Sequence, residues 1–415
     1  MKTQLFLFFL LFLIDFSVAL NSKYKNYINY KYYDIKSDEN TLENLVKVLK
    51  EKDNTLIYAN EKTSAQLIVA PELESVFLEL TRKAKINTTL LYNDISEVIR
   101  SEKPVDIRKN RKGFSWDAYY DVDDIYNYLS NVSETYPQWT EIIVGGKSYE
   151  GRQIKGIRIN TPTEDGVEKP VFFIEAGIHA REWIAPATTT YFINQLLTSS
   201  NGNITRLRDQ FDWRIFPTVN PDGYHYSYVF DRYWRKTRSI SHNGCIGADP
   251  NRNWDYNWGQ HSASTNPCDY QLYAGSRPFS EIETRTLSSY ISGIDNLLFY
   301  VGFHSYASLL LIPYSDSTVH VHNYDDLVAV GKTSLDYGEN RERYKGPATA
   351  AEALYKASGG SMDWVRYTFN TPFVYTYELR GSSFHWPAKK IPEQGDEVTQ
   401  MILGLADGAK NLGYY

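Results

Sequence analysis

The sequence predicts an α/β protein with a mixed, mostly parallel sheet flanked by helices, preceded by a small α+β domain. Apolar runs of the kind found in buried strands recur along the second part of the chain. Helical patterns separate these runs, as in sheets covered by helices on both faces. Residues 20–112 instead show shorter alternating elements. A chain of 415 residues is long enough for both parts.

The first 19 residues have the pattern of a secretory signal. Lys2 is the basic end, Leu5–Ile14 is the apolar run, and Ser17–Ala19 is a small-x-small cleavage motif. The apolar run is too short to span a bilayer. We therefore expect residues 1–19 to be removed and the protein to be secreted to the extracellular space, with no membrane-spanning segment elsewhere.

Residues 20–112 are predicted to form the small domain. Leucine and valine at helical spacing indicate a helix over Thr41–Glu51, where Asn40 suits the N-cap. Pro71 suits the first position of the next helix. The other expected elements are strands at Ile28–Tyr32, Thr55–Ala59, Ala65–Ala70 and Thr88–Tyr92, and helices at Pro71–Lys85 and Ile95–Ser101. The strand and helix order is that of a split βαβ, or ferredoxin-like, domain.

A basic run, Arg108–Lys112, separates the two parts of the chain. Such a run is usually a solvated linker, and in a secreted protein it also suits cleavage by a trypsin-like protease. Residues 113–415 then form the large domain. Its expected strands are Gly156–Ile159, Val171–Ile174, Trp213–Val219, Leu297–Phe303 and Phe373–Glu378. Its expected helices are Val122–Tyr136, Pro186–Leu197, Glu281–Ile294, Asp325–Tyr337, Gly360–Phe369 and Glu393–Lys410.

The two cysteines indicate a disulfide, and the net charge bears on the kind of partner that the protein binds. Cys245 and Cys268 are expected to form a disulfide, as an isolated pair does in a secreted chain. A two-cysteine metal site, with His242 and His261 as further ligands, is the alternative. A formal net charge of −6 argues against a nucleic-acid-binding protein.

Three residues form a candidate metal site at the ends of two predicted strands. His179 and Glu182 follow the strand Val171–Ile174, and His304 follows the apolar run from Leu297. The carboxyl ends of strands in an open α/β sheet meet at the edge where ligands bind. Two histidines and a carboxylate with one open position are the ligand set of a hydrolytic zinc site.

Around these residues the sequence resembles the zinc metallocarboxypeptidases of the carboxypeptidase A/B family, in their secreted zymogen form. The resemblance covers nearly all of the chain after the signal. The matching stretches are GIHAREW (Gly177–Trp183), NPDG (Asn220–Gly223), YWRKTRS (Tyr233–Ser239), DPNRNW (Asp249–Trp254), FHSY (Phe303–Tyr306), YKASGGSMDW (Tyr355–Trp364) and YTYELR (Tyr375–Arg380). Together, and in this order, they are highly specific.

The resemblance implies roles for residues around the metal. His179, Glu182 and His304 would bind one Zn²⁺, and Asp249 would orient His179. Glu378 would be the general base, and Arg235 would stabilise the oxyanion.

The resemblance also implies which residues hold the substrate. Asn251 and Arg252 would bind the terminal carboxylate, and Tyr355 would close over it. Arg181, Ser305 and Tyr306 would contact the peptide further along, and a cis peptide is expected at Ser305–Tyr306. Between Glu378 and Pro387 the chain is shorter than the family pattern, at a loop expected to affect outer substrate contacts only.

Met362 indicates the specificity. Family members that remove Lys or Arg carry an aspartate at this position, and Ala350, Leu354 and Thr376 add no charge. Glu352 also lies close in sequence, and it would receive a cation if its side chain turned into the pocket. We expect a preference for aliphatic and aromatic C-terminal residues, because a buried cation without a counter-charge is strongly disfavoured.

The sequence thus predicts a secreted zinc exopeptidase zymogen with residues 20–112 as propeptide. Its partners would be peptide C-termini and an activating trypsin-like protease, with no nucleic acid or membrane, and the chain is expected to be a monomer. A carboxypeptidase specific for basic residues, and a catalytically silent peptide-binding protein on the same fold, are the alternatives.

Overall fold

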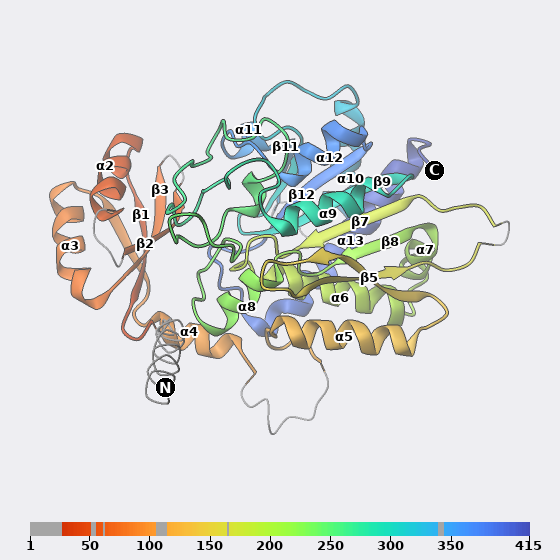
Figure 1. Cartoon of the computed structure of the whole chain (residues 1–415), viewed down its shortest axis with the longest axis horizontal. Coiled ribbons are helices and arrows are strands. Elements are labelled where there is room, and N and C mark those ends of the chain that lie inside the picture. Colours follow the sequence, from red (N-terminus) through yellow and green to blue (C-terminus); the bar gives the residue numbers. More distant parts are fainter. Residues whose placement is uncertain (1–26, 51–54, 61–62, 105–113, 164–165, 339–343) are drawn as a thin grey trace, which may run out of the picture. The chain divides into compact units, whose positions relative to one another are not determined.

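The computed structural model describes residues 27–50, 55–60, 63–104, 114–163, 166–338 and 344–415 (Figure 1). The predicted signal, residues 1–19, and the basic run Arg108–Lys112 lie outside the described residues. The chain divides into two units. The smaller contains most of the chain up to Ser96 together with Tyr226–Arg232, and the larger contains nearly all of the rest, including the segment after Glu97.

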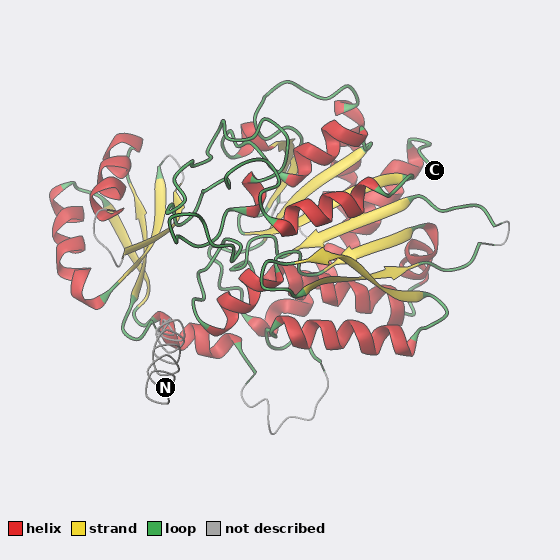
Figure 2. Cartoon of the chain, viewed as in Figure 1, coloured by secondary structure: helices red, strands yellow, loops and turns green. Residues whose placement is uncertain are grey.

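The larger unit is built on an eight-stranded mixed sheet (Figures 1 and 2). Its strand order is β11-β10-β12-β9-β7-β8-β6-β5. The strands are β5 (Thr140–Lys147), β6 (Gln153–Ile159), β7 (Val171–Ala176), β8 (Asp212–Phe216), β9 (Leu297–Ser305), β10 (Leu309–Ile312), β11 (Lys345–Thr349) and β12 (Phe373–Leu379). The four central strands β12, β9, β7 and β8 run parallel, and the edge pairs β5–β6, β6–β8 and β10–β12 are antiparallel.

Helices cover the sheet and pack against one another. They are α5 (Val122–Thr135), α6 (Ile184–Thr198), α7 (Gly202–Gln210), α8 (Pro221–Val229), α9 (Ile282–Ser292), α10 (Tyr324–Tyr337), α11 (Ala350–Ala353), α12 (Ser361–Phe369) and α13 (Ile391–Asn411). α13 packs against α10 and α6, whereas α12 packs on β12 and β9, and α9 on β5. Among the described residues, no helix combines the length and apolar character that crossing a bilayer requires.

The two faces of the central strands have different cores, because successive side chains alternate between faces. On one face, the rings of Trp213, Phe172 and Phe299 stack with centroids 4.6 and 4.5 Å apart, and Phe373 continues the row 5.0 Å beyond Phe299. The other face buries a cluster that includes Phe173, Tyr300, Val374, Leu287 of α9 and Val365 of α12. Both faces are therefore dry, as the continuous apolar runs predict.

All of the strands and helices predicted for the larger unit form, with shifted ends. β8 stops at Phe216 instead of Val219, where Pro217 cannot donate a ladder hydrogen bond. α6 begins at Ile184 rather than Pro186, because proline is tolerated in a first turn. Among the described residues, the structure adds elements without a predicted counterpart: β5, β10, β11, α7, α8, α11 and the short helices η2 (Pro250–Arg252) and η3 (Ala388–Lys390).

The smaller unit has the predicted strand–helix–strand–strand–helix–strand order and a sheet ordered β2-β3-β1-β4. Its elements are β1 (Lys31–Lys36), α2 (Glu39–Lys50), β2 (Thr55–Asn60), β3 (Ser64–Val69), the short helix η1 (Pro71–Leu73), α3 (Glu74–Lys83) and β4 (Asn87–Tyr92). Helix α4 (Ile95–Glu102) follows, and from Glu97 onward it belongs to the larger unit. The strand predicted at Ile28–Tyr32 begins later, at Lys31, because Tyr27 and Asn29 have φ angles of 50° and 59° and the chain turns there.

Cys245 and Cys268 form the expected disulfide. The alternative of a two-cysteine metal site is therefore excluded.

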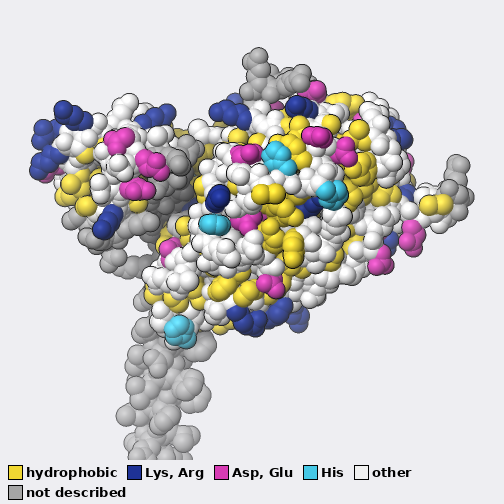
Figure 3. All heavy atoms as spheres, turned by 90° about the horizontal axis from the view of Figure 1, so that it is seen from above, with side chains coloured by type: hydrophobic (Ala, Val, Ile, Leu, Met, Phe, Trp, Pro, Cys, Tyr) yellow, Lys and Arg dark blue, Asp and Glu magenta, His cyan; other side chains and the backbone are white. Residues whose placement is uncertain are grey.

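On the face of the larger unit seen in Figure 3, acidic and basic side chains are interspersed among exposed hydrophobic ones rather than gathered by sign.

Candidate active site

His179 and Glu182 lie in the connection between β7 and α6. Gly177 turns the chain out of the strand with a φ of 67°, and a side chain there would lie 3.1 Å from Pro186. The backbone N–H of Glu182 donates to the carbonyl of His179 at 3.3 Å. This tight turn brings the two side chains to the same side of the loop.

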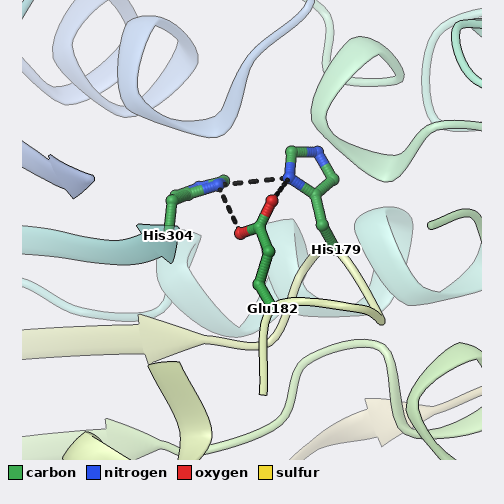
Figure 4. Close-up of side chains that lie close together, drawn as sticks. All are labelled: His179, Glu182 and His304. Carbon is green, nitrogen blue, oxygen red and sulfur yellow. Dashed lines mark hydrogen bonds and ion pairs between the residues drawn. The ribbon is translucent and has the colours of Figure 1, made fainter. Parts of the chain in front are cut away.

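His304 faces the same point from the end of β9 (Figure 4). Its Nδ1 lies 3.2 Å from Oε2 of Glu182 and 3.2 Å from Nδ1 of His179. Nδ1 of His179 lies 2.8 Å from the other carboxylate oxygen of Glu182. The structure therefore brings the three predicted metal ligands together.

These three side chains fit a zinc ion. All are buried, and one ligand atom from each lies within 4.8 Å of the others. Two imidazole nitrogens and a carboxylate oxygen are ligands that zinc prefers, and three of them leave a fourth position open. Among the described residues, this is the one such group of histidine, cysteine and acidic side chains.

Burial and charge act in opposite directions on Glu182. Burial alone would raise the pKa of its carboxyl group, but the imidazoles of His179 and His304 outweigh that effect and lower it. Glu182 is thus held as a carboxylate, the form that binds a cation. Its Oε2 also accepts the backbone N–H of Ser305 at 3.1 Å, which ties the β7–α6 loop to the end of β9.

Asp249 fixes the orientation of His179. Nε2 of His179 lies 3.2 Å from Oδ1 of Asp249, while Oδ2 accepts two hydrogen bonds from Arg235, at 3.1 and 2.9 Å. Burial would raise the pKa of Asp249, but Arg235 and His179 hold it well below its usual value. A proton on Nε2 leaves the Nδ1 lone pair of His179 directed at Glu182 and His304.

Glu378 stands beside His304. It is paired with His304 in the parallel register of β12 and β9, so both side chains project from the same face of the sheet. Burial raises the pKa of Glu378 to about 7, with Glu182 adding to the effect and His304 and Arg235 opposing it. Arg235 also lies near the ligands, with Nη1 4.0 Å from Oε1 of Glu182.

Arg252 and Tyr355 come together from distant parts of the chain. Nη2 of Arg252 donates to the hydroxyl of Tyr355 at 3.3 Å, and its Nη1 donates to the carbonyl of Asn251 at 2.8 Å. Oδ1 of Asn251 accepts the first backbone N–H of α12, from Ser361, at 3.0 Å. Arg252 is buried, whereas Tyr355 is 46% exposed and has room to move.

Arg181 and Tyr306 meet at Phe384. The Arg181 guanidinium lies 4.5 Å from the centre of the Phe384 ring, and the ring of Tyr306 is 5.0 Å from it. Nη1 of Arg181 also donates to Oε1 of Gln271 at 2.8 Å. Phe384 and Gln271 each lie in a loop where no periodicity marks them, so the sequence alone does not indicate that they contact Arg181. The expected cis peptide at Ser305–Tyr306 is present.

Met362 lies in the first turn of α12, buried over β12. Its sulfur is 3.4 Å from the Thr376 hydroxyl, and Ala350 belongs to the same buried cluster. The carboxylate of Glu352 accepts a hydrogen bond from Thr349 at 2.7 Å and lies 3.9 Å from His320. Glu352 is thus engaged by other partners.

Comparisons with known proteins identify the family of this chain. The sequence model of a family described as zinc carboxypeptidase matches residues 125–401. Zinc carboxypeptidase A 1 of Drosophila melanogaster is 36% identical over 427 residues, covering 99% of this chain and 98% of the relative. Carboxypeptidase B of Astacus astacus is 36% identical over 304 residues, covering 71% and 98%.

A solved structure extends the similarity to the fold. The crystal structure of thrombin activatable fibrinolysis inhibitor superposes with a TM-score of 0.84 at 25% identity, covering 91% of this chain and 98% of that one. The family model spans more than half of the chain, and the Drosophila relative spans nearly all of it. The chain therefore belongs to the zinc carboxypeptidase family and is a zinc-dependent peptide hydrolase.

Proposed function

We propose that this protein is a secreted carboxypeptidase, made as a zymogen, that releases aliphatic and aromatic residues one at a time from peptide C-termini. The observation that carries the proposal is the placement of Glu378 beside His304, next to a buried ligand set of His179, Glu182 and His304. A base next to a metal site is an arrangement that activates a water molecule for hydrolysis of a peptide bond. The alternative of a silent binding protein lacks support, because every residue of this machinery is present.

Each residue around the proposed metal site has a separate role in the reaction. Bound zinc, held by His179, Glu182 and His304, supplies Lewis acidity toward water and the scissile carbonyl. Glu378 takes a proton from the attacking water and delivers it to the leaving amine. Arg235 is held by Asp249 with its remaining donors available to stabilise the developing oxyanion.

Recognition of the substrate's terminal carboxylate restricts cleavage to the last peptide bond. Arg252 offers a planar fork of donors suited to a carboxylate, and Asn251 adds an amide beside it. Tyr355 already touches Arg252 and is exposed enough to close over a bound terminus. Arg181, Ser305 and Tyr306, together with Phe384, hold the peptide further from the scissile bond.

The specificity follows from Met362. A C-terminal side chain next to Met362, Thr376 and Ala350 meets mainly apolar surface, and an apolar side chain gains roughly 25 cal/mol per Å² buried there. Glu352, whose carboxylate is engaged by Thr349, supports the same preference. Relatives are named both carboxypeptidase A and B, so a preference for basic residues is the second candidate.

Residues 20–112 are the proposed propeptide, after a signal over 1–19 and before a catalytic domain over 113–415. The similar protein described as thrombin activatable supports activation by a protease. Glu102, just before the basic run, accepts a buried hydrogen bond of 2.8 Å from Nδ1 of His385, and both residues belong to the larger unit. This bond holds the end of the propeptide until a trypsin-like protease cuts within Arg108–Lys112. The protein is proposed to act as a monomer.

Peptides that differ only in their last residue test the proposal. The secreted full-length protein is assayed on peptides ending in Phe, Leu, Lys and Arg, before and after limited trypsin treatment, with mass spectrometry of the products. We expect negligible release before trypsin, and rapid loss of single Phe or Leu residues afterwards. Faster release of Lys or Arg would establish the basic specificity, and equal activity before and after trypsin would refute the zymogen.

A further inference from the structure

Another buried carboxylate, that of Glu175, lies beside the residues that we propose to contact the C-terminal side chain of the substrate. Glu175 of β7 pairs with Gly302 of β9, and Gly302 pairs with Thr376 of β12. Paired residues of neighbouring strands share one face, so these three form a row across the sheet. His304 and Glu378 form the parallel row two residues further on, about 6.6 Å away.

Within the described part of the chain, only one of the two carboxylate oxygens of Glu175 has hydrogen-bond partners. Its Oε1 accepts hydrogen bonds of 3.4 Å from the hydroxyls of Tyr300 and Ser361, whereas Oε2 is buried with no hydrogen-bond partner among the described residues. A buried carboxylate oxygen without a hydrogen-bond partner destabilises the folded protein. Burial raises the pKa of Glu175 to about 7. A cation that reached this carboxyl group would relieve both effects.

Gly302 leaves space between Glu175 and Thr376. A methyl group on Gly302 would lie 3.1 Å from Oε1 of Glu175 and 3.6 Å from the Thr376 hydroxyl. Met362 contacts the Thr376 end of this row, with its sulfur 3.4 Å from that hydroxyl, while its neighbour Ser361 touches Glu175. A methionine side chain is unbranched and adapts its shape readily. It therefore forms a movable cover.

We infer that Glu175 is a second specificity-determining residue, concealed beneath Met362, which receives the ammonium group of a C-terminal lysine when the Met362 side chain is displaced. The inference rests on the proposed role of Met362 in receiving the C-terminal side chain. A buried ammonium needs a counter-charge, and Glu175 supplies one that the sequence pattern around Met362 does not reveal. Peptides that end in lysine are then cleaved slowly, because the Met362 side chain must first move, but they are not excluded as substrates.

The test is a double-mutant cycle between Met362→Ala and Glu175→Gln. The ratio of kcat/KM for peptides ending in Lys and in Leu is measured for the trypsin-treated wild type, both single variants and the double variant. We expect Met362→Ala to raise the Lys-to-Leu ratio at least about tenfold, because it opens the space to Glu175, and Glu175→Gln to abolish that gain. An equal gain in the double variant would overturn the inference.

Two further variants separate the possible failures. Met362→Leu keeps the volume of the cover, and the Lys-to-Leu ratio should stay low. Met362→Val, which removes fewer atoms, replaces Met362→Ala if the latter does not fold. If Met362→Ala changes the Lys-to-Leu ratio and Glu175→Gln does not reverse that change, only the role of Glu175 is refuted. If no Met362 variant changes the ratio, the proposed role of Met362 fails as well.

Discussion

Oδ1 of Asp249 lies 3.2 Å from Nε2 of His179, on the side of the imidazole ring away from Glu182 and His304. The same carboxylate holds Arg235 through its other oxygen. One buried aspartate thus connects a proposed metal ligand to the proposed oxyanion donor. This arrangement makes Asp249 a positioning residue for both.

Asp249→Asn should therefore weaken zinc binding. An asparagine still fills the space, but it no longer favours the proton on Nε2 of His179 and leaves the Arg235 guanidinium without its counter-charge. We expect about 10–100-fold weaker zinc affinity, measured by competition with a chelator. Asp255→Asn, at an exposed position nearby, is the matched control. Zinc affinity within twofold of wild type would show that Asp249 does not orient the ligand.

His304→Ala should remove most of the bound metal. Two protein ligands, His179 and Glu182, are too few for a tight zinc site. Purified protein analysed for metal should contain far less than one zinc per chain. His320→Ala changes a partly exposed histidine that lies 3.9 Å from Glu352, and it should keep full zinc. Full occupancy in the His304 variant would exclude this residue as a ligand.

Arg252→Lys should impair recognition of the free C-terminus. Lysine keeps the charge but loses the planar fork that binds a carboxylate through two hydrogen bonds. We expect kcat/KM to fall about 10–100-fold for free peptides, and the discrimination against C-terminally amidated peptides to shrink. Arg285→Lys, on an exposed surface, is the control. Unchanged discrimination would place carboxylate recognition elsewhere.

Replacing both cysteines by serine should destabilise the protein. The disulfide joins residues 23 apart, and closing a loop of that size lowers the entropy of the unfolded chain by an amount worth about 3 kcal/mol. Guanidinium unfolding at equilibrium measures the loss. Reductant should destabilise the wild type and leave the double variant unaffected. A loss below about 1 kcal/mol would mean that the native state offsets the constraint.

The sequence was most informative where a motif coincides with a strand end. His179, Glu182, His304 and Glu378 could be placed together because the carboxyl ends of parallel strands share one edge. The apolar runs of β7, β9 and β12 identified those strands, because strands buried on both faces are continuously apolar. The helices α10 and α13 were recognisable by their spacing alone.

What the sequence did not reveal depends on contacts across the fold. β10 and β11 are short and lie toward the sheet edge, with little patterning of their own. Phe384 becomes part of the site only through its packing on Arg181 and Tyr306. Glu175 follows an apolar run and reads as the end of a strand. Its place beside Gly302 depends on register, which a single sequence does not specify.

The measurement that tests the account most directly combines zinc content with turnover in Glu378→Gln. Glutamine has nearly the same shape but cannot accept the proton, so the variant should bind zinc and peptide normally. Its turnover should fall by at least about 10²–10⁴-fold, the usual contribution of a general base. Glu352→Gln, which changes a partly exposed glutamate, should retain full turnover. Near-normal turnover of a zinc-loaded Glu378→Gln protein would contradict the assignment of Glu378 as the base beside His304.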